Sequence, residues 1–360
     1  MNSAAPALSP SRSNSVFKAW FDLFVYLVLA FGLLAITVWV SGAEVGEAFN
    51  AFKRGVFGSS AAWGETLART AAFTFPGLAV ALAFRAGLLN IGADGQFLCG
   101  AAGAAFCATK VLPAGVPAPL AALATLLMGA LFGAGWALFP ALLKKYRGVS
   151  EVISTILLNE FAKIGLRMLV KEPSLLQAHG TIMPKGEAFP DGAQFHGWAG
   201  TQFHAGIFWV IPFALILHAW IFHTRSGMAL RAAGFNPRAA LACGVPVNRL
   251  MLTTFLLSGA LAGWGGAMSV MALGYLPAES PYPDCGYLAI AVALCAGLKP
   301  IWILPSAYSF AALQTGTKAM ERVAHVASEA VFLVEGVVII ALLARGAHVP
   351  GQPAEKKNAE

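Results

Sequence analysis

Long apolar segments recur along the whole chain, and a glycine-rich polar stretch interrupts them once. The stretch covers residues 85–97 and carries Asn90, Asp94 and Gln96. A spanning helix needs about 20 apolar residues, so this length leaves room for about eight to ten spans with short loops. Polar groups at membrane depth must line a cavity, contact other helices or lie at the membrane edge. The pattern predicts an all-α polytopic membrane protein that handles a polar solute, with residues 85–97 as a broken or re-entrant segment.

The apolar runs place the expected spans, and two of them, the third and the eighth, are short enough to be half-helices. The runs are Phe17–Val40, Trp63–Phe84, Phe97–Leu112, Pro117–Leu143, Val149–Val170, Gly206–Phe222, Leu250–Leu273, Gly286–Leu298, Ile301–Thr317 and Val326–Ala344. Three regions follow: a disordered cytoplasmic tail at 1–15, a transmembrane domain at 16–346 and a cytoplasmic C-terminal tail at 347–360.

Composition and charge agree with a membrane protein. The chain is 58% hydrophobic and 11% charged, whereas a soluble domain carries about 25% charged residues. The net charge of +7 comes from basic residues that lie mostly in loops, which is typical of membrane orientation rather than of nucleic-acid binding. Both termini are expected in the cytoplasm, together with the loop near 223–249. The long loop near 171–205 is expected on the outer face.

The cytoplasmic loop contains a short predicted helix near 236–244. Asn236 is a good N-cap, Pro237 is tolerated in the first turn, and Gly244 followed by Pro246 ends the helix. A helix of two turns is marginal alone in water. Two interpretations stand equally on local chemistry: the helix docks into a groove on a partner, or it is a connector lying on its own protein.

Asn90, Asp94 and Gln96 are candidates for a solute path. Amide side chains donate and accept hydrogen bonds, and an ionised carboxylate accepts them, so a neutral, hydroxyl-rich solute suits this set. The alternative is that Asn90 and Gln96 bond between helices and hold a broken helix in place.

Charged residues lie inside the fifth span. Glu160, Lys163 and Arg167 are spaced three and four residues apart, so they fall near one helix face and can pair with one another. A proton relay is the functional alternative, because ionisable residues within a membrane are candidates for function.

The seventh span carries a GxxxG motif at Gly259 and Gly263 within a stripe of small residues. This motif predicts a face that packs closely against another helix. The sequence contains no G-x-x-x-x-G-K-[ST] and no H-E-x-x-H motif, so we expect no nucleotide or metal site on this chain and no enzymatic activity of its own.

Three segments appear in the order found in one family of transporters: 87–97 (GLLNIGADGQF), 149–159 (VSEVISTILLN) and 231–244 (RAAGFNPRAALACG). The chain thereby resembles permease subunits of ATP-binding-cassette (ABC) importers for nucleosides and simple sugars, a group related to ribose and branched-chain amino-acid permeases. The resemblance covers residues 20–345. It implies a plasma-membrane location. Asn159, on the fifth span, is a further candidate for the solute path. Asp94 stands where nucleoside-type permeases more often have Glu.

The resemblance also implies partners. These are a second, identical or different, permease subunit, two cytoplasmic ATPase subunits that hold ATP, and an extracytoplasmic solute-binding protein. It implies that the predicted helix is the coupling helix that enters the ATPase. The residues assigned to this coupling segment are Arg231, Gly234, Asn236, Pro237, Arg238 and Gly244. The alternative is a secondary transporter or channel that works without an ATPase and uses the charges of the fifth span.

Overall fold

The structure is a computed structural model, and it describes most of the chain. The described residues are 25, 28, 31–40, 42–113, 115–171, 173–178, 180, 184–198, 201, 203–324 and 336–337. The tails predicted at 1–15 and 347–360, and all but residues 336–337 of the span predicted at 326–344, lie outside them.

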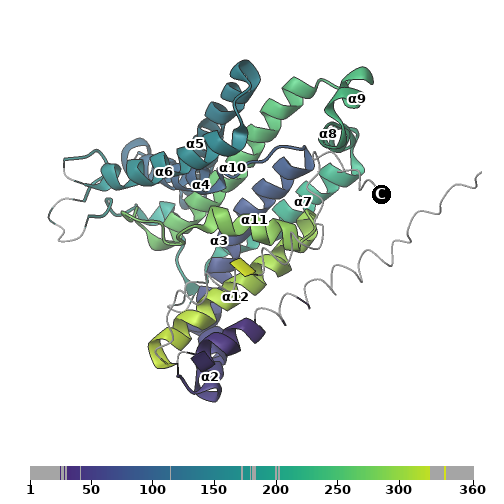
Figure 1. The fold of residues 1–360 in the computed structure, drawn as a ribbon. Coiled ribbons are helices and arrows are strands. Elements are labelled where there is room, and N and C mark those ends of the chain that lie inside the picture. The colour runs from purple at the N-terminus through teal and green to yellow at the C-terminus, as the bar shows by residue number, and fades with distance from the viewer. Residues whose placement is uncertain are drawn as a thin grey trace, which may run out of the picture.

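The described residues form helices joined by loops, which confirms the all-α prediction (Figure 1). In chain order the α-helices are α2 (Val45–Phe57), α3 (Ser60–Arg85), α4 (Ala93–Phe106), α5 (Ala118–Arg147), α6 (Glu151–Val170), α7 (Val210–His223), α8 (Arg225–Phe235), α9 (Pro237–Ala242), α10 (Val247–Leu273), α11 (Cys285–Cys295) and α12 (Pro300–Ala324). A short apolar helix, Phe31–Val40, precedes them. Within the described part of the chain, four helical segments are long and apolar enough to cross a membrane: Ser60–Arg85, Ala118–Arg147, Ala205–His223 and Val247–Leu273.

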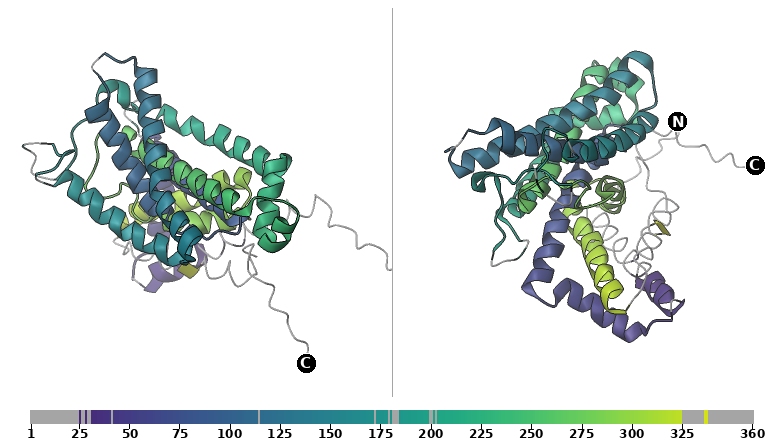
Figure 2. Two further views of the ribbon diagram at one scale, coloured as in Figure 1. Left: turned by 90° about the horizontal axis from the view of Figure 1, so that it is seen from above. Right: turned by 90° about the vertical axis from the view of Figure 1, so that its left-hand side faces the viewer.

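The centre of the molecule is formed by α4, α5 and α10, which pack on one another, and by α3, which packs on α10. Small residues make this close approach feasible, because they let helix backbones touch. α6 packs along α4 and α5, whereas α12 and α2 lie beside α3 on the other side of the molecule. The right-hand view of Figure 2 shows the same separation, with α5 and α6 at the top and α2 and the end of α12 at the bottom.

Two helices that the hydropathy pattern did not predict are present. α2 carries Lys53 and Arg54, yet it is amphipathic and buries Ala48, Phe52 and Val56; it packs against α12. α8 is capped by Thr224, whose hydroxyl accepts a hydrogen bond from the Gly227 amide at 3.1 Å. Both are held by packing rather than by an apolar run long enough to span.

The polar stretch predicted as broken at 85–97 is non-helical over a shorter range. α3 ends at Arg85 and α4 begins at Ala93, so the break is residues 86–92, and Asp94 and Gln96 lie in the first turn of α4 rather than in the break. Gly87 has φ +73°, which glycine adopts without strain. α4 ends in a π-helical turn at Cys107–Val111.

α11 is a half-length helix of 11 residues, as the short eighth run suggested. A segment of turns and bends, residues 274–284, leads into it from the end of α10, where the Phe189 amide donates to Gly274 O at 2.8 Å. This contact ties the segment to the long loop near 171–205. Figure 1 shows that loop and the α8–α9 pair at opposite ends of the molecule.

Candidate functional site

The amides of Asn90 and Gln96 pair with each other at the start of α4. Asn90 Nδ2 donates to Gln96 Oε1 at 2.9 Å, and Gln96 Nε2 donates to Asn90 Oδ1 at 3.1 Å. Asn90 Nδ2 also donates to Ser258 Oγ at 2.8 Å, and Ser258 donates to Ala79 O at 2.8 Å. The three polar side chains are fully buried. This network ties the break to α3 and α10, which is the helix-holding arrangement.

Asn159 of α6 also bonds to the break. Its Oδ1 accepts from the Gly95 amide at 2.8 Å and its Nδ2 donates to Ile91 O at 3.0 Å. The first four amides of a helix lack intrahelical partners, so Asn159 satisfies one of them in α4. Glu151, at the start of α6, accepts from the Leu89 amide at 3.5 Å. α6 therefore carries two side chains that fix the path of the break.

Asp94 lies where two helices begin. Its side chain is 2% exposed, and Oδ1 accepts a hydrogen bond from the Gly286 amide in the first turn of α11 at 3.1 Å. α4 and α11 both present their N-terminal ends to this carboxylate, and such ends favour negative charge. A Cβ on Gly286 would overlap the backbone and side chain of Asp94, so only glycine permits this approach.

Lys163 of α6 faces three carboxylates. Its Nζ lies 3.0 Å from Asp284 Oδ1, 3.3 Å from Glu160 Oε1 and 3.7 Å from Asp94 Oδ2. It also lies 5.4 Å from the centre of the Tyr287 ring. The pairing of Glu160 with Lys163 follows from their spacing, but Arg167 pairs instead with Glu279, at 3.1 Å.

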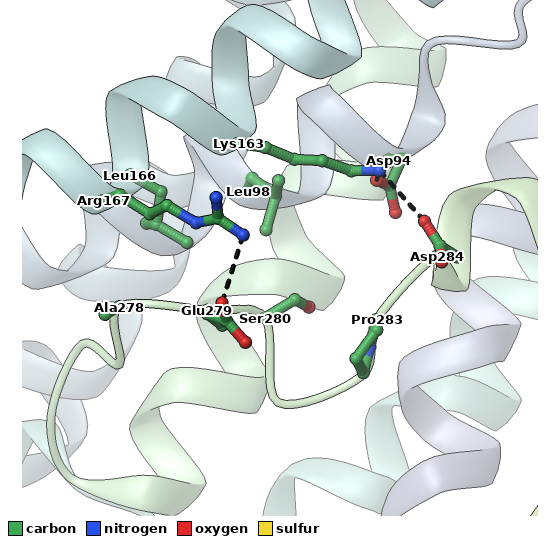
Figure 3. Close-up of a pocket in the computed structure, with 10 residues that line it drawn as sticks. All are labelled: Asp94, Leu98, Lys163, Leu166, Arg167, Ala278, Glu279, Ser280, Pro283 and Asp284. Carbon is green, nitrogen blue, oxygen red and sulfur yellow. Dashed lines mark hydrogen bonds and ion pairs between the residues drawn. The ribbon is translucent and has the colours of Figure 1, made fainter. Parts of the chain in front are cut away.

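All of these residues except Glu160 and Tyr287 line a pocket of about 200 Å³. Figure 3 shows Lys163 reaching from α6 toward Asp94 and Asp284, and Arg167 reaching toward Glu279 on the segment before α11. The remaining lining residues are Leu98, Leu166, Ala278, Ser280 and Pro283. Of the four predicted path residues, Asp94 is the one that lines this pocket.

The predicted coupling segment is a capped helix on the surface. Asn236 Oδ1 accepts from the Ala239 amide at 3.1 Å, Pro237 is the first residue of α9, and Gly244 has φ +82°. Arg238 and Gly244 are exposed, as are the apolar side chains of Phe235 (74% exposed) and Leu241 (64% exposed). Two of the assigned residues, Arg231 and Gly234, belong to α8.

Gly234 is in backbone contact with the break. A Cβ on Gly234 would overlap Arg85 O and lie 3.0 Å from Gly87 N. Arg85 then reaches the end of α11, because its Nη2 donates to Gly297 O at 2.7 Å and its Nε to Leu298 O at 3.0 Å. The guanidinium groups of Arg85 and Arg231 each lie 5.2 Å from the Phe222 ring centre. The predicted coupling segment is thus joined to the break and to α11.

Gly259 and Gly263 lie where α10 crosses α5 and α4. A Cβ on Gly259 would lie 3.0 Å from the carbonyl carbon of Gly133, and one on Gly263 would lie 2.9 Å from Gly133 Cα. Gly100 of α4 approaches Gly263 in the same way. The GxxxG face therefore contacts two helices at once.

Sequence reasoning did not single out Asp284, Glu279 or Arg85. Asp284 precedes the half-helix α11 and has φ +55°, and the sequence Pro-Asp-Cys-Gly before an apolar run was the available signal for a helix start. The segment before α11 was assigned to a loop, so its approach to Lys163 could not be foreseen.

The fold and this site define a polytopic membrane protein that has a charged internal pocket joined through packed elements to an exposed capped helix. Within the described ranges, no cluster of three metal-ligating side chains occurs. The family described as branched-chain amino acid transport system / permease component matches residues 64–343, and the chain belongs to it.

Curated relatives are similar over most of their length. The chain is 31% identical to a guanosine ABC transporter permease protein of Bacillus subtilis, covering 88% of this chain and 90% of the relative. It is 30% identical to a nucleoside ABC transporter permease protein of Lactococcus lactis (84% and 87%) and 30% identical to a glucose ABC transporter permease protein of Haloferax volcanii (78% and 75%). No solved structure matches the chain.

The chain is therefore the membrane-spanning permease subunit of an ABC importer, a multi-pass protein of the inner membrane. The relatives are ABC permeases, so family membership favours this function over a secondary transporter or channel that works without an ATPase. The charges of α6 do not decide between the two. Lys163 and Arg167 are engaged in ion pairs with Asp284 and Glu279.

Proposed function

We propose that this subunit carries a nucleoside or a related hydroxyl-rich compound, and that ATP hydrolysis on separate cytoplasmic subunits drives the transport through α9. The solute preference rests on the similarity to the guanosine and nucleoside permeases. No cofactor is needed on this chain, because the energy enters through the ATPase partners. A second permease subunit and an extracytoplasmic solute-binding protein complete the importer.

The observation that carries the proposal is the surface chemistry of α9. A helix of six residues has little stability of its own in water, yet α9 has a side-chain cap and a glycine stop, and it stands on a solvent-exposed end of the molecule. Phe235 and Leu241 project from its surroundings as exposed apolar side chains. Burial of exposed apolar side chains against a partner is favourable. A groove on an ATPase subunit would bury both.

The solute path is proposed to pass the pocket between α4, α6 and α11. Its walls carry Asp94, Lys163 and Asp284 beside Leu98 and Leu166, so both polar and apolar parts of a solute find partners. Asn90, Gln96 and Asn159 contribute indirectly, by holding the break and the start of α4. The affinity of this pocket can be low, because the binding protein performs the capture.

The orientation proposed from charge places both termini and α9 in the cytoplasm. Lys144, Lys145 and Arg147 lie in the last turn of α5, and Arg225, Arg231, Arg238 and Arg249 lie between the start of α8 and the first turn of α10. Basic residues concentrate on the cytoplasmic side of membrane proteins. The long loop near 171–205 then lies outside, where the binding protein docks.

The test compares two glycines with similar positive φ angles. Gly244 has φ +82° and Gly115 has φ +87°, and a Cβ at either position meets nothing within 4 Å. Gly244→Lys and Gly115→Lys therefore impose the same backbone strain, of about 1–2 kcal/mol. They differ in that Gly244 ends α9, whereas Gly115 lies in the loop between α4 and α5.

The complete importer is reconstituted in proteoliposomes, and radiolabelled guanosine is supplied bound to the binding protein. We expect Gly244→Lys to abolish ATP-dependent uptake and to weaken co-purification of the ATPase subunits, while Gly115→Lys retains both. Equal uptake by the two variants would count against docking through α9. Failure of the wild-type importer to take up guanosine or any other nucleoside while it accumulates a different class of solute would refute the nucleoside assignment alone.

A further inference from the structure

We propose that Lys163 is a positioning residue that closes the floor of the pocket by bridging α6 to the start of α11, and that inward passage requires it to release Asp284 and remain with Asp94. This inference rests on the proposed function, since it names the groups that move in the proposed path. Under this proposal the ion pair between Lys163 and Asp284 breaks and re-forms during transport, instead of only stabilising the fold.

The geometry gives Lys163 two alternative partners on different elements. Asp284 stands at the start of α11 and is 50% exposed, whereas Asp94 stands in the first turn of α4 and is 2% exposed. The nitrogen lies 3.0 Å from the first carboxylate and 3.7 Å from the second. A small rotation of the lysine side chain therefore exchanges the 3.0 Å pair with Asp284 for a closer pair with Asp94, which Lys163 already contacts.

The exchange is asymmetric in cost. Asp284 can turn to water when Lys163 leaves it, because half of its side chain is exposed. Asp94 cannot, since a buried carboxylate without its cation is strongly destabilising. Lys163 therefore keeps Asp94 in both arrangements and gives up Asp284 in one of them. Two packed states that differ by one surface ion pair are the kind of bistable element on which conformational switches depend.

α11 connects this bridge to the coupling segment. Its first turn lies at the pocket, where the Gly286 amide bonds to Asp94. Beyond its last turn, the carbonyl groups of Gly297 and Leu298 accept from Arg85. Arg85 O in turn contacts Gly234 of α8, directly before α9. Movement of α9 is thereby delivered to one end of a short rigid helix whose other end carries Asp284.

A cysteine already present beside the bridge can report whether the bridge opens. Cys285 follows Asp284, is fully buried, and has its sulfur 3.9 Å from Asp94 Oδ1. When Asp284 leaves Lys163 and the start of α11 moves, this thiol becomes accessible from the pocket. Labelling of Cys285 by a small hydrophilic thiol reagent, measured by peptide mass spectrometry, reports the opening without any need for transport.

The experiment uses the purified chain in lipid nanodiscs and four variants. Lys163→Met and Asp284→Asn remove the bridge, and we expect Cys285 to be labelled about two- to fivefold faster in both, because partly exposed ion pairs contribute only modestly to stability. Lys163→Arg keeps a cation within reach and should label as slowly as the wild type. Glu160→Gln is the matched control: it also contacts Lys163, at 3.3 Å, but lies on the same helix and bridges nothing.

In Lys163→Met, opening of the bridge and loss of the positive charge change the rate of Cys285 labelling in opposite directions. Loss of a nearby cation disfavours the thiolate and by itself slows labelling, whereas opening accelerates it. Slower or unchanged labelling in Lys163→Met, or equal acceleration in Glu160→Gln, would overturn the proposal. In the full importer, Asp284→Asn should raise the ATP consumed per solute by about two- to fivefold without changing the melting temperature. The labelling result stands even where guanosine is not the solute, so the two proposals fail separately.

Discussion

Replacing Gly133 by alanine tests whether the central helices are held at backbone contact. A Cβ at Gly133 would lie 2.7 Å from Gly263 Cα and 2.9 Å from Gly263 N, and it would overlap Gly259 O. Ordinary contact begins near 3.4 Å, so α5 and α10 would have to separate by about 1 Å to relieve the tightest of these contacts, which is with Gly259 O, and packed interiors resist such a shift. Overpacking of this kind costs about 1–3 kcal/mol.

Gly135 is the matched control, two residues along the same helix. A Cβ there meets nothing within 4 Å, so Gly135→Ala should be neutral or stabilise the helix by about 0.5–1 kcal/mol. The assay is the monodisperse fraction of detergent-purified protein after heating. We expect Gly133→Ala to lower the apparent melting temperature by about 2–10 °C. Equal melting of the two variants would refute close packing at this crossing.

Three further predictions concern other parts of the molecule. Asn90→Ala leaves the buried Gln96 amide without its partner, which costs about 1–3 kcal/mol for each unpaired group, so folded yield should fall; yield equal to the wild type would contradict the network. Asn236→Ala removes the cap on α9 and about 1 kcal/mol of helix stability, so pull-down of ATPase subunits should weaken, and undiminished pull-down would contradict the docking role. Burial lowers the pKa of His204 from 6.5 to about 4. The unfolded chain therefore binds the proton first, and up to about 3 kcal/mol of stability is lost as the pH falls from 6.5 to 4; melting temperatures across this range should fall more steeply in the wild type than in His204→Phe, and parallel curves would contradict it.

Elements with strong local signals were predictable from the sequence. The apolar runs give α3, α5 and α10, because spanning helices must be both long and apolar. The start and stop of α9 follow from Asn236, Pro237 and Gly244, whose effects depend only on neighbouring backbone atoms. The GxxxG pair at 259 and 263 likewise predicts a packing face before its partners are known.

Elements that depend on distant contacts were not predictable. α2 contains charged residues and no apolar run, so its sequence resembles a loop. It is helical because Phe52 and Val56 are buried and the helix packs against α12. The pocket brings Lys163 to Asp284 across 121 positions of sequence, and nothing in either local segment encodes that approach. Asp94 was a candidate from the sequence, but its bond to the Gly286 amide depends on where the half-helix α11 begins.

The central claim is that transport through this subunit is driven by a separate ATPase bound at α9. Guanosine uptake is measured in proteoliposomes that contain the permease and binding protein, with and without the ATPase subunits, under an imposed proton gradient. The account predicts accumulation only when the ATPase subunits and ATP are both present. Uptake at the full rate without the ATPase subunits would contradict it.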